Sequence, residues 1–146
     1  MIQRIQTVFL LLCAAGFGLL YAFPFAATDI PGKQMLADSL YTIQDNIILM
    51  VIAGIGTLLA LISIFRFRNR SQQIKINYVV IALALIFIAT GGWFFIQEGD
   101  DWLSKVQVTF KAGAFLPVVV VLFAILANMY IRKDHKKVRS AYDRLR

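Results

Sequence analysis

The sequence predicts an all-α membrane protein with four transmembrane helices in an up-down bundle. Two observations predict it: four apolar runs of transmembrane length, and positive charges that collect on one side of the bilayer once those runs are placed. The composition agrees, because 60% of the 146 residues are hydrophobic and 16% are charged, against about 25% charged residues in an ordinary soluble domain. A mean hydropathy of +0.73 therefore predicts lipid, rather than water, around much of the chain.

The four apolar runs give the expected spans. A transmembrane helix needs about 20 apolar residues to cross the hydrocarbon core at about 1.5 Å per residue. No run contains Asp, Glu, Lys, Arg or His, so none has the charged face that a helix in a globular protein turns toward water. The expected spans are residues 5–23, 46–65, 76–96 and 114–131.

The first run also has the order of a secretory signal, with a basic start, an apolar stretch and small residues toward its end. We expect it to be retained as a helix. It carries Cys13, the only cysteine in the sequence. That residue cannot form an internal disulfide, and we expect a small buried thiol.

Positive charges predict the orientation of the spans. Lys and Arg are hard to translocate, so they accumulate in short cytoplasmic segments. With four spans, twelve of the fifteen Lys and Arg residues fall on one side, together with both termini, and six of the eight acidic residues fall on the other. We therefore expect cytoplasmic termini. The expected cytoplasmic basic face consists of Arg66, Arg68, Arg70, Lys75, Arg132, Lys133, Lys136, Lys137, Arg139, Arg144 and Arg146.

The chain divides into a transmembrane domain, residues 1–131, and a basic cytoplasmic tail, residues 132–146. Apolar and aromatic side chains recur at spacings of 4, 3, 4 and 3 in this region, which predicts an amphipathic helix continuing from the fourth span. Its basic flanks suit anionic lipid headgroups, worth about 1 kcal/mol per Lys or Arg. We expect the tail to contact lipid, the chain's own loop or a partner protein, and not nucleic acid. The tail stripe is Ile131, His135, Val138, Tyr142 and Leu145.

The extracytoplasmic segments are expected to be short. Residues 29–33, "DIPGK", carry a Pro and Gly turn signal. Beyond them, residues 36–47 place apolar side chains at spacings of 4, 3 and 4, which predicts a helix leading into the second span. Residues 105–111, "KVQVTFK", alternate apolar and polar side chains, which predicts an extended segment.

Aromatic residues mark the expected ends of the spans. Belt anchoring at the headgroup level is the common explanation, and an aromatic cage for a ligand is the alternative. The outer group is Tyr21, Phe23, Phe25, Trp93, Phe94, Phe95 and Trp102, and the inner group is Phe65, Phe67, Tyr78 and Tyr130.

Small residues predict where the first two helices touch. Helix association in lipid depends on close approach of the backbones, which small side chains permit. The same spacing would also join two copies of the protein. The expected contact residues are Ala14, Gly18, Ala53, Gly56, Thr57 and Ala60. In the fourth span Asn128 is the most polar residue at depth, and it is expected to bond to a neighbouring helix or to water.

The spans offer little for chemistry. A proton-coupled transporter normally keeps an ionisable residue at membrane depth, and these runs contain none. His135 and Cys13 are each the only residue of their type, so one chain cannot assemble a metal or haem site from them. No phosphate-binding loop, nucleophile elbow or HExxH motif is present. We expect no enzymatic activity, no cofactor and no metal.

The two ends of the chain and the second connection carry a family resemblance. They are "MIQRIQTVFLLL", "LANMYIRKDHKKVRSAYDRLR" and "RFRNRSQQIKIN". The chain resembles, along its whole length, an uncharacterised family of small four-span integral membrane proteins of Bacteroidota, a domain of unknown function. The resemblance implies a multi-pass protein of the bacterial inner membrane and supplies no activity, substrate or catalytic residue.

Two classes of function are compatible with these expectations. The first is a small accessory or structural subunit that binds other membrane proteins through its helices and its basic cytoplasmic face. The second is a small homo-oligomeric transporter or channel. Elution only with other polypeptides after mild solubilisation would favour the first class, and a conducting homo-oligomer in liposomes would favour the second.

Overall fold

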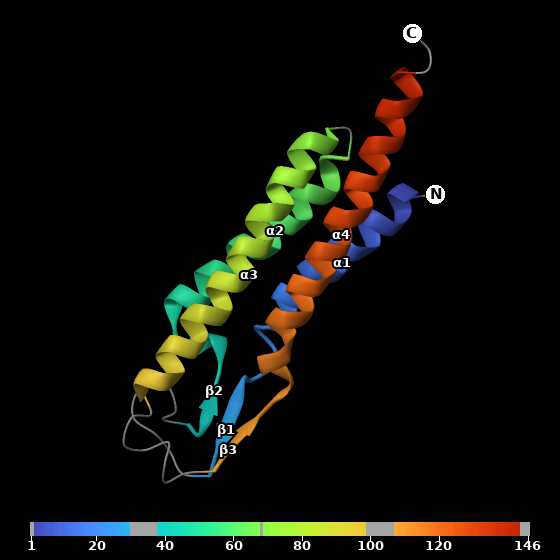
Figure 1. The fold of residues 1–146 in the computed structure, drawn as a ribbon. Helices are drawn as coiled ribbons and strands as arrows, with labels where there is room; N and C mark the ends of the chain where they lie inside the picture. The colour runs from blue at the N-terminus through green and yellow to red at the C-terminus, as the bar shows by residue number, and fades with distance from the viewer. Residues whose placement is uncertain (1, 30–37, 68, 99–106, 144–146) are drawn as a thin grey trace.

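Helices and short strands make up the fold, a computed structural model drawn in Figure 1. The structure describes residues 2–29, 38–67, 69–98 and 107–143, and it gives side-chain surroundings for residues 5–29, 38–67, 69–97 and 107–135. The elements are α1 (Ile2–Leu19), β1 (Ala26–Thr28), β2 (Leu40–Tyr41), the 3-10 helix η1 (Ile43–Asp45), α2 (Ile47–Phe65), α3 (Arg70–Glu98), β3 (Val108–Phe110) and α4 (Ala112–Asp143).

The four helices lie side by side along one long axis (Figure 1). α1 and α3 each pack against both α2 and α4. The strands gather at one end of the bundle, called here the sheet end, and both chain termini lie toward the other. This other end, where α2 turns into α3, is called the turn end.

Three helices are long and apolar enough to cross a membrane: Ile47–Phe65, Arg70–Gln97 and Ala112–His135. The spans expected at residues 46–65, 76–96 and 114–131 thus each have a helix of sufficient length and apolar character. The described apolar stretch of α1, Ile5–Leu19, is shorter. The run expected to extend to Phe23 ends as a helix at Leu19, and the Phe23 N–H donates to the Leu19 carbonyl at 3.1 Å in the turn that follows.

Side-chain caps define the N-termini of α2 and α3. The Asn46 side chain accepts a hydrogen bond from the Ile48 N–H at 2.8 Å, which begins α2. The Asn69 side chain accepts from the Gln72 N–H at 3.3 Å, so α3 begins before the expected residue 76. Such caps satisfy N–H groups that have no partner inside a helix. At the other end of the chain α4 continues to Asp143, which confirms a helix running from the fourth span into the tail.

A small antiparallel sheet covers the sheet end, so the fold is mostly helical rather than all-α. Its strand order is β2-β1-β3. In this register Ala26 lies opposite Tyr41 on one side and opposite Phe110 on the other. The extended segment expected within residues 105–111 is confirmed by β3.

The helix expected over residues 36–47 is wrong within the described residues, and Leu36 lies outside them. Ser39 has a φ of 62°, a left-handed conformation that interrupts a helix. The N–H and the hydroxyl of Thr42 both donate to Asp45 Oδ2, at 2.6 and 2.9 Å. This local capping forms the short η1 helix and separates β2 from α2.

Candidate functional site

α1 and α2 are in contact, and most of the small residues expected at this contact are buried. Ala14, Ala53, Gly56 and Ala60 are buried, and the ring of Phe17 lies so close to Gly56 that an added Cβ would come within 2.7 Å of it. Thr57 is half-buried, and its hydroxyl donates to the Ala53 carbonyl at 2.9 Å. The expected contact of these two helices is therefore present.

Gly18 is not part of this contact. It is exposed, and a Cβ placed on it would meet no atom within 4 Å. Gly16 takes the close-packed position instead, against Val120 of α4. The signal that finds Gly16 is its place on one face with Cys13 and Leu20, at spacings of 3 and 4, both of which are fully buried.

The seam between α1 and α4 is tied by polar and aromatic contacts. The Gln6 amide donates to the Tyr130 carbonyl at 3.2 Å, and the ring of Tyr130 stacks on Phe9 with centroids 5.5 Å apart. Cys13 is buried, as expected, and its thiol lies 3.7 Å from the Val120 carbonyl. These contacts fasten the shorter α1 along the longest helix of the bundle.

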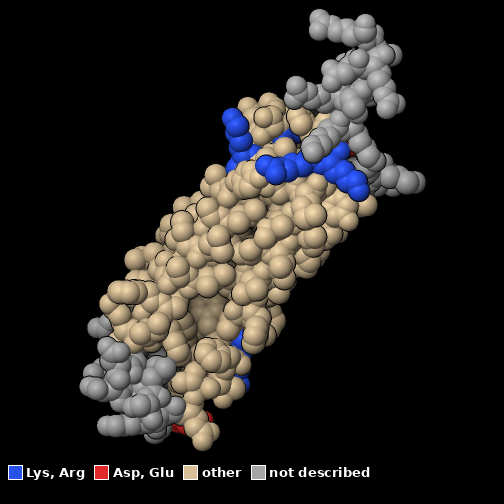
Figure 2. Space-filling view, in the orientation of Figure 1, with Lys and Arg blue, Asp and Glu red and all other residues tan. Residues whose placement is uncertain are grey.

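Described members of the basic face gather at the turn end, where Figure 2 shows Lys and Arg in blue. Two contacts order this end: Arg70 forms an ion pair with Asp134 at 3.0 Å, and the guanidinium of Arg132 lies 5.4 Å from the ring centroid of Tyr78. Both join α3 to α4. The described members are Arg66, Arg70, Lys75, Arg132 and Lys133, and the side chains of Arg68, Lys136, Lys137, Arg139, Arg144 and Arg146 lie outside the described part.

A cavity of about 530 Å³ lies beside these cations, on α3 and α4. Ile74 and Met129 provide apolar lining, and Arg132, Lys133 and His135 provide a polar rim. The neighbouring Asp134 carboxylate is paired with Arg70, which is itself a member of the basic face.

Only part of the tail stripe is described. Ile131 is fully buried and His135 is exposed. Val138 and Tyr142 lie within α4, but their side-chain surroundings, like Leu145 as a whole, lie outside the described residues. The helix of the tail is thus present, and its amphipathic face stays a prediction.

A layer of buried polar side chains lies inside the bundle near the turn end, and we call Ser63, Gln73, Asn77 and Asn128 the polar layer. The Gln73 amide donates to the Ser63 carbonyl at 3.0 Å, which links α3 to α2. The Asn77 amide donates to the Ala124 carbonyl at 2.7 Å, which links α3 to α4. Asn128 follows Ala124 by one helical turn, so the four residues come from α2, α3 and α4.

The polar layer retains unused hydrogen-bonding capacity. The side-chain oxygens of Ser63, Gln73, Asn77 and Asn128 have no hydrogen-bond partner within the described part of the protein, although all four residues are at least nine-tenths buried. Of these residues the sequence singled out Asn128 alone. The missed signal is a stripe with spacings of 4, 3, 4 and 3 on α3, in which polar residues precede buried apolar ones: Gln73, Asn77, Val80, Ala84 and Phe87.

Replacing Asn77 by leucine is expected to raise the free energy of unfolding by about 1 kcal/mol, because an unpaired buried oxygen costs about 1–3 kcal/mol while a hydrogen bond in a membrane protein contributes about 0.6 kcal/mol. Leucine keeps the branch at Cγ. The measurement is the rate at which a maleimide dye modifies Cys13 during denaturation in detergent, since this single thiol is buried. Asn77→Ala is the control, and we expect it to be less stable than the Leu variant because it leaves a void. A Leu variant that is less stable than the wild type would contradict the prediction that the Asn77 side-chain oxygen is unpaired.

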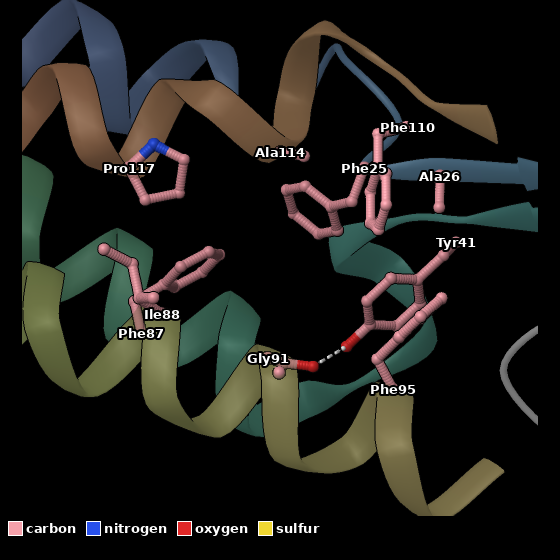
Figure 3. A pocket seen from close by; sticks show the side chains of 11 residues that line it. Phe25, Ala26, Tyr41, Phe87, Ile88, Gly91, Phe95, Phe110, Ala114 and Pro117 are labelled. Atoms are coloured by element: carbon pink, nitrogen blue, oxygen red, sulfur yellow. Dashed lines mark hydrogen bonds between the residues drawn. The ribbon is translucent and has the colours of Figure 1, made fainter. Parts of the chain in front are cut away.

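An aromatic pocket of about 180 Å³ lies at the sheet end (Figure 3). The Tyr41 hydroxyl donates to the Gly91 carbonyl at 3.0 Å, and the ring of Phe25 packs edge-on against Tyr41 and Phe87, with centroids 5.4 and 5.8 Å apart. The pocket is lined by Phe25, Ala26, Tyr41, Phe87, Ile88, Gly91, Gly92, Phe95, Phe110, Ala114 and Pro117.

The pocket divides the outer aromatic group. Phe23 and Trp93 are exposed, in keeping with belt anchoring. Phe25 and Phe95 instead line the pocket, and whether they bind a ligand stays a prediction. Tyr41 and the glycines at positions 91 and 92 were not among the aromatic residues expected from the sequence to form a cage. They come to the pocket through the sheet register and the α3–α4 contact, which short local patterns do not encode.

The comparisons with known proteins identify a family. A family model described as a domain of unknown function, DUF4293, matches residues 2–145. The chain belongs to this family. The comparisons with curated proteins and with solved structures gave no match. The family membership expected from the two ends of the chain is thus confirmed, without an assigned activity.

In this member of the DUF4293 family, the two ends of the bundle present different chemistry. The turn end offers cations and a polar interior, and the sheet end offers an apolar cavity with a single tyrosine hydroxyl. Among the described residues, no group of three or more His, Cys, Asp or Glu side chains is placed to hold a metal ion.

Proposed function

We propose that the protein is a small accessory or structural subunit of the bacterial inner membrane. It forms an up-down bundle of four transmembrane helices with both termini in the cytoplasm, and it binds another membrane protein through its helices and its basic cytoplasmic face. Anionic lipid headgroups are further partners of that face. We expect no enzymatic activity.

One observation carries the proposal: the described cations of the bundle are concentrated at the turn end, and a long uncharged belt separates them from the sheet end (Figure 2). Positive charge next to a membrane end favours the cytoplasmic side. The α1 helix supports a fourth span, since its 18 residues rise about 27 Å, close to the hydrocarbon core of about 30 Å.

The interior supports a binding role over conduction through one chain. Between the polar layer and the aromatic pocket the described core side chains are apolar and closely packed, with Phe17, Val80 and Val120 fully buried. An ion path through such a segment would lack polar groups to replace hydration. The outward faces of the helices are free for lipid or for a partner helix.

The orientation is tested by single cysteines in a Cys13→Ser background. A membrane-impermeant maleimide is applied to cells whose outer membrane has been permeabilised. We expect it to label Thr109→Cys at the sheet end. Ser71→Cys at the turn end should be labelled only after the inner membrane is opened. Both positions are exposed. The reverse pattern would contradict cytoplasmic termini.

The partner is tested by mild solubilisation of tagged protein from native membranes. We expect other membrane polypeptides to elute with it reproducibly. Lys133→Gln should lower their recovery because it removes a cation from the basic face. Lys111→Gln is the matched control, since it removes an exposed cation next to β3 at the sheet end. Reproducible elution as a lone monomer would contradict the proposal. Elution as a homo-oligomer that conducts ions or solutes in liposomes would favour the channel or transporter.

A further inference from the structure

The aromatic pocket lies at a defined depth along the bundle. Its α3 lining runs from Phe87 to Phe95, and α3 ends at Glu98. At about 1.5 Å per residue, these positions lie about 5 to 17 Å inside that end of the helix. In a hydrocarbon core of about 30 Å, this range corresponds to the half of the bilayer nearest the sheet end.

The mouth of the pocket opens sideways, between α3 and α4. Ile88, Gly92 and Phe110 are exposed parts of its lining, while Phe25, Phe87 and Pro117 are buried. Figure 2 shows this mouth as a hollow in the uncharged surface near the sheet end. In a membrane, a molecule that enters from this side comes from the lipid phase.

The size of the pocket limits its occupant. Its volume of about 180 Å³ is below the range of about 300–1,000 Å³ that holds a whole drug-sized ligand, but it is similar to the cavity of about 150 Å³ that takes a benzene molecule. A pocket of this size holds a small molecule, or one segment of a longer molecule whose remainder stays outside the mouth.

The lining selects hydrocarbon. The aromatic rings and the Pro117 ring provide an apolar wall (Figure 3). The polar handle within it is the Tyr41 hydroxyl, which already donates to the Gly91 carbonyl. A polar segment would find too few donors and acceptors in this lining to satisfy its hydrogen bonds, whereas a chain of methylene groups needs none.

We propose that the aromatic pocket binds a segment of one acyl chain of a membrane phospholipid from the leaflet next to the sheet end. The proposal rests on the membrane placement in the proposed function, but not on the existence of a protein partner. Gly92 is the entry position, because a Cβ there meets no protein atom within 4 Å and a larger side chain would extend into the mouth.

The test uses a phosphatidylethanolamine with a photoactivatable diazirine in its acyl chain, in vesicles that contain the full-length protein. After irradiation, mass spectrometry locates the lipid adducts. We expect adducts concentrated on the α3 segment 87–95 and on α4 near Pro117. Gly92→Leu should lower this labelling by about tenfold, equivalent to about 1.4 kcal/mol. Gly18→Leu is the matched control, since Gly18 also faces open space but lies outside the pocket, and it should leave the labelling unchanged.

Two results of the vesicle labelling would overturn the proposal. One is wild-type labelling of the pocket no stronger than that of the exposed α2 face around Val51 and Leu58. The other is undiminished pocket labelling in the Gly92→Leu protein, whose folding is checked by protection of Cys13 from maleimide. A photoreactive amino acid at Ile88 that captures a polypeptide in native membranes, in place of a lipid, would assign the pocket to a protein contact and also overturn it. Absence of copurifying proteins does not affect the vesicle labelling, so the two proposals fail separately.

Discussion

Gly113→Ala is expected to lower the free energy of unfolding by about 3 kcal/mol, at the upper end of the usual cost of overpacking. A Cβ on Gly113 would lie 2.5 Å from the carbonyl oxygen of Pro24 and 2.6 Å from that of Phe23. Both are backbone atoms, so no rotamer change can relieve the clash. The Gly113 N–H also donates to the Pro24 carbonyl at 3.1 Å, and the backbone shift that makes room for a methyl group would weaken this bond.

Cys13 provides the measurement. It is the only thiol in the sequence and is fully buried, so its reaction with a maleimide dye during heating or denaturant titration reports unfolding. The control is Gly18→Ala, which adds the same methyl group within a helix where it meets nothing and should raise stability by up to about 1 kcal/mol through helix propensity. Equal stability of the two variants would contradict the close approach at Gly113.

Gly56→Ala is expected to cost about 1–3 kcal/mol, the second large effect. The added Cβ would lie 2.7 to 2.9 Å from three ring carbons of Phe17. Phe17 is fully buried, so its ring has no open space into which to turn.

A double-mutant cycle isolates this contact. Phe17→Leu alone should destabilise the protein, because a smaller side chain leaves a void. In its presence Gly56→Ala should cost less than in the wild type, since the shorter side chain can accommodate the methyl group, and the difference measures the coupling. The readout is again the denaturation midpoint of Cys13 modification. Strict additivity of the two changes would contradict a direct Phe17–Gly56 contact.

The sequence predicted the helical framework of this protein because lipid imposes a simple rule on it. A run of about 20 apolar residues has to satisfy its backbone groups internally, and a helix does so. Residues 46–65 thus give α2 almost to the residue. The pairing of the sheet, unlike the extended segment that forms β3, was not predicted, because strands of two or three residues depend on contacts between segments far apart in the chain. Residues 36–47 had helical spacing, but the Thr42–Asp45 hydrogen bonds decided the local structure.

The candidate sites differ in how far sequence reasoning reaches them. The basic face follows from charge alone, and its described members gather as expected. The polar layer has a signal in the spacing of Gln73 and Asn77 with the buried residues of α3, which the apolar run from residue 76 concealed. The aromatic pocket draws lining from β1, β2, α3, β3 and α4, so no single periodicity contains it.

The unbroken α4 sets the reach of the tail. Its 32 residues rise about 48 Å, which exceeds a hydrocarbon core of about 30 Å by several helical turns. In Figure 1 the helix continues straight beyond the turn that joins α2 to α3. With the helices placed across the membrane as proposed above, the backbone of the tail points away from the bilayer instead of lying along it, and a partner bound to its last turns is held at a fixed height above the membrane surface.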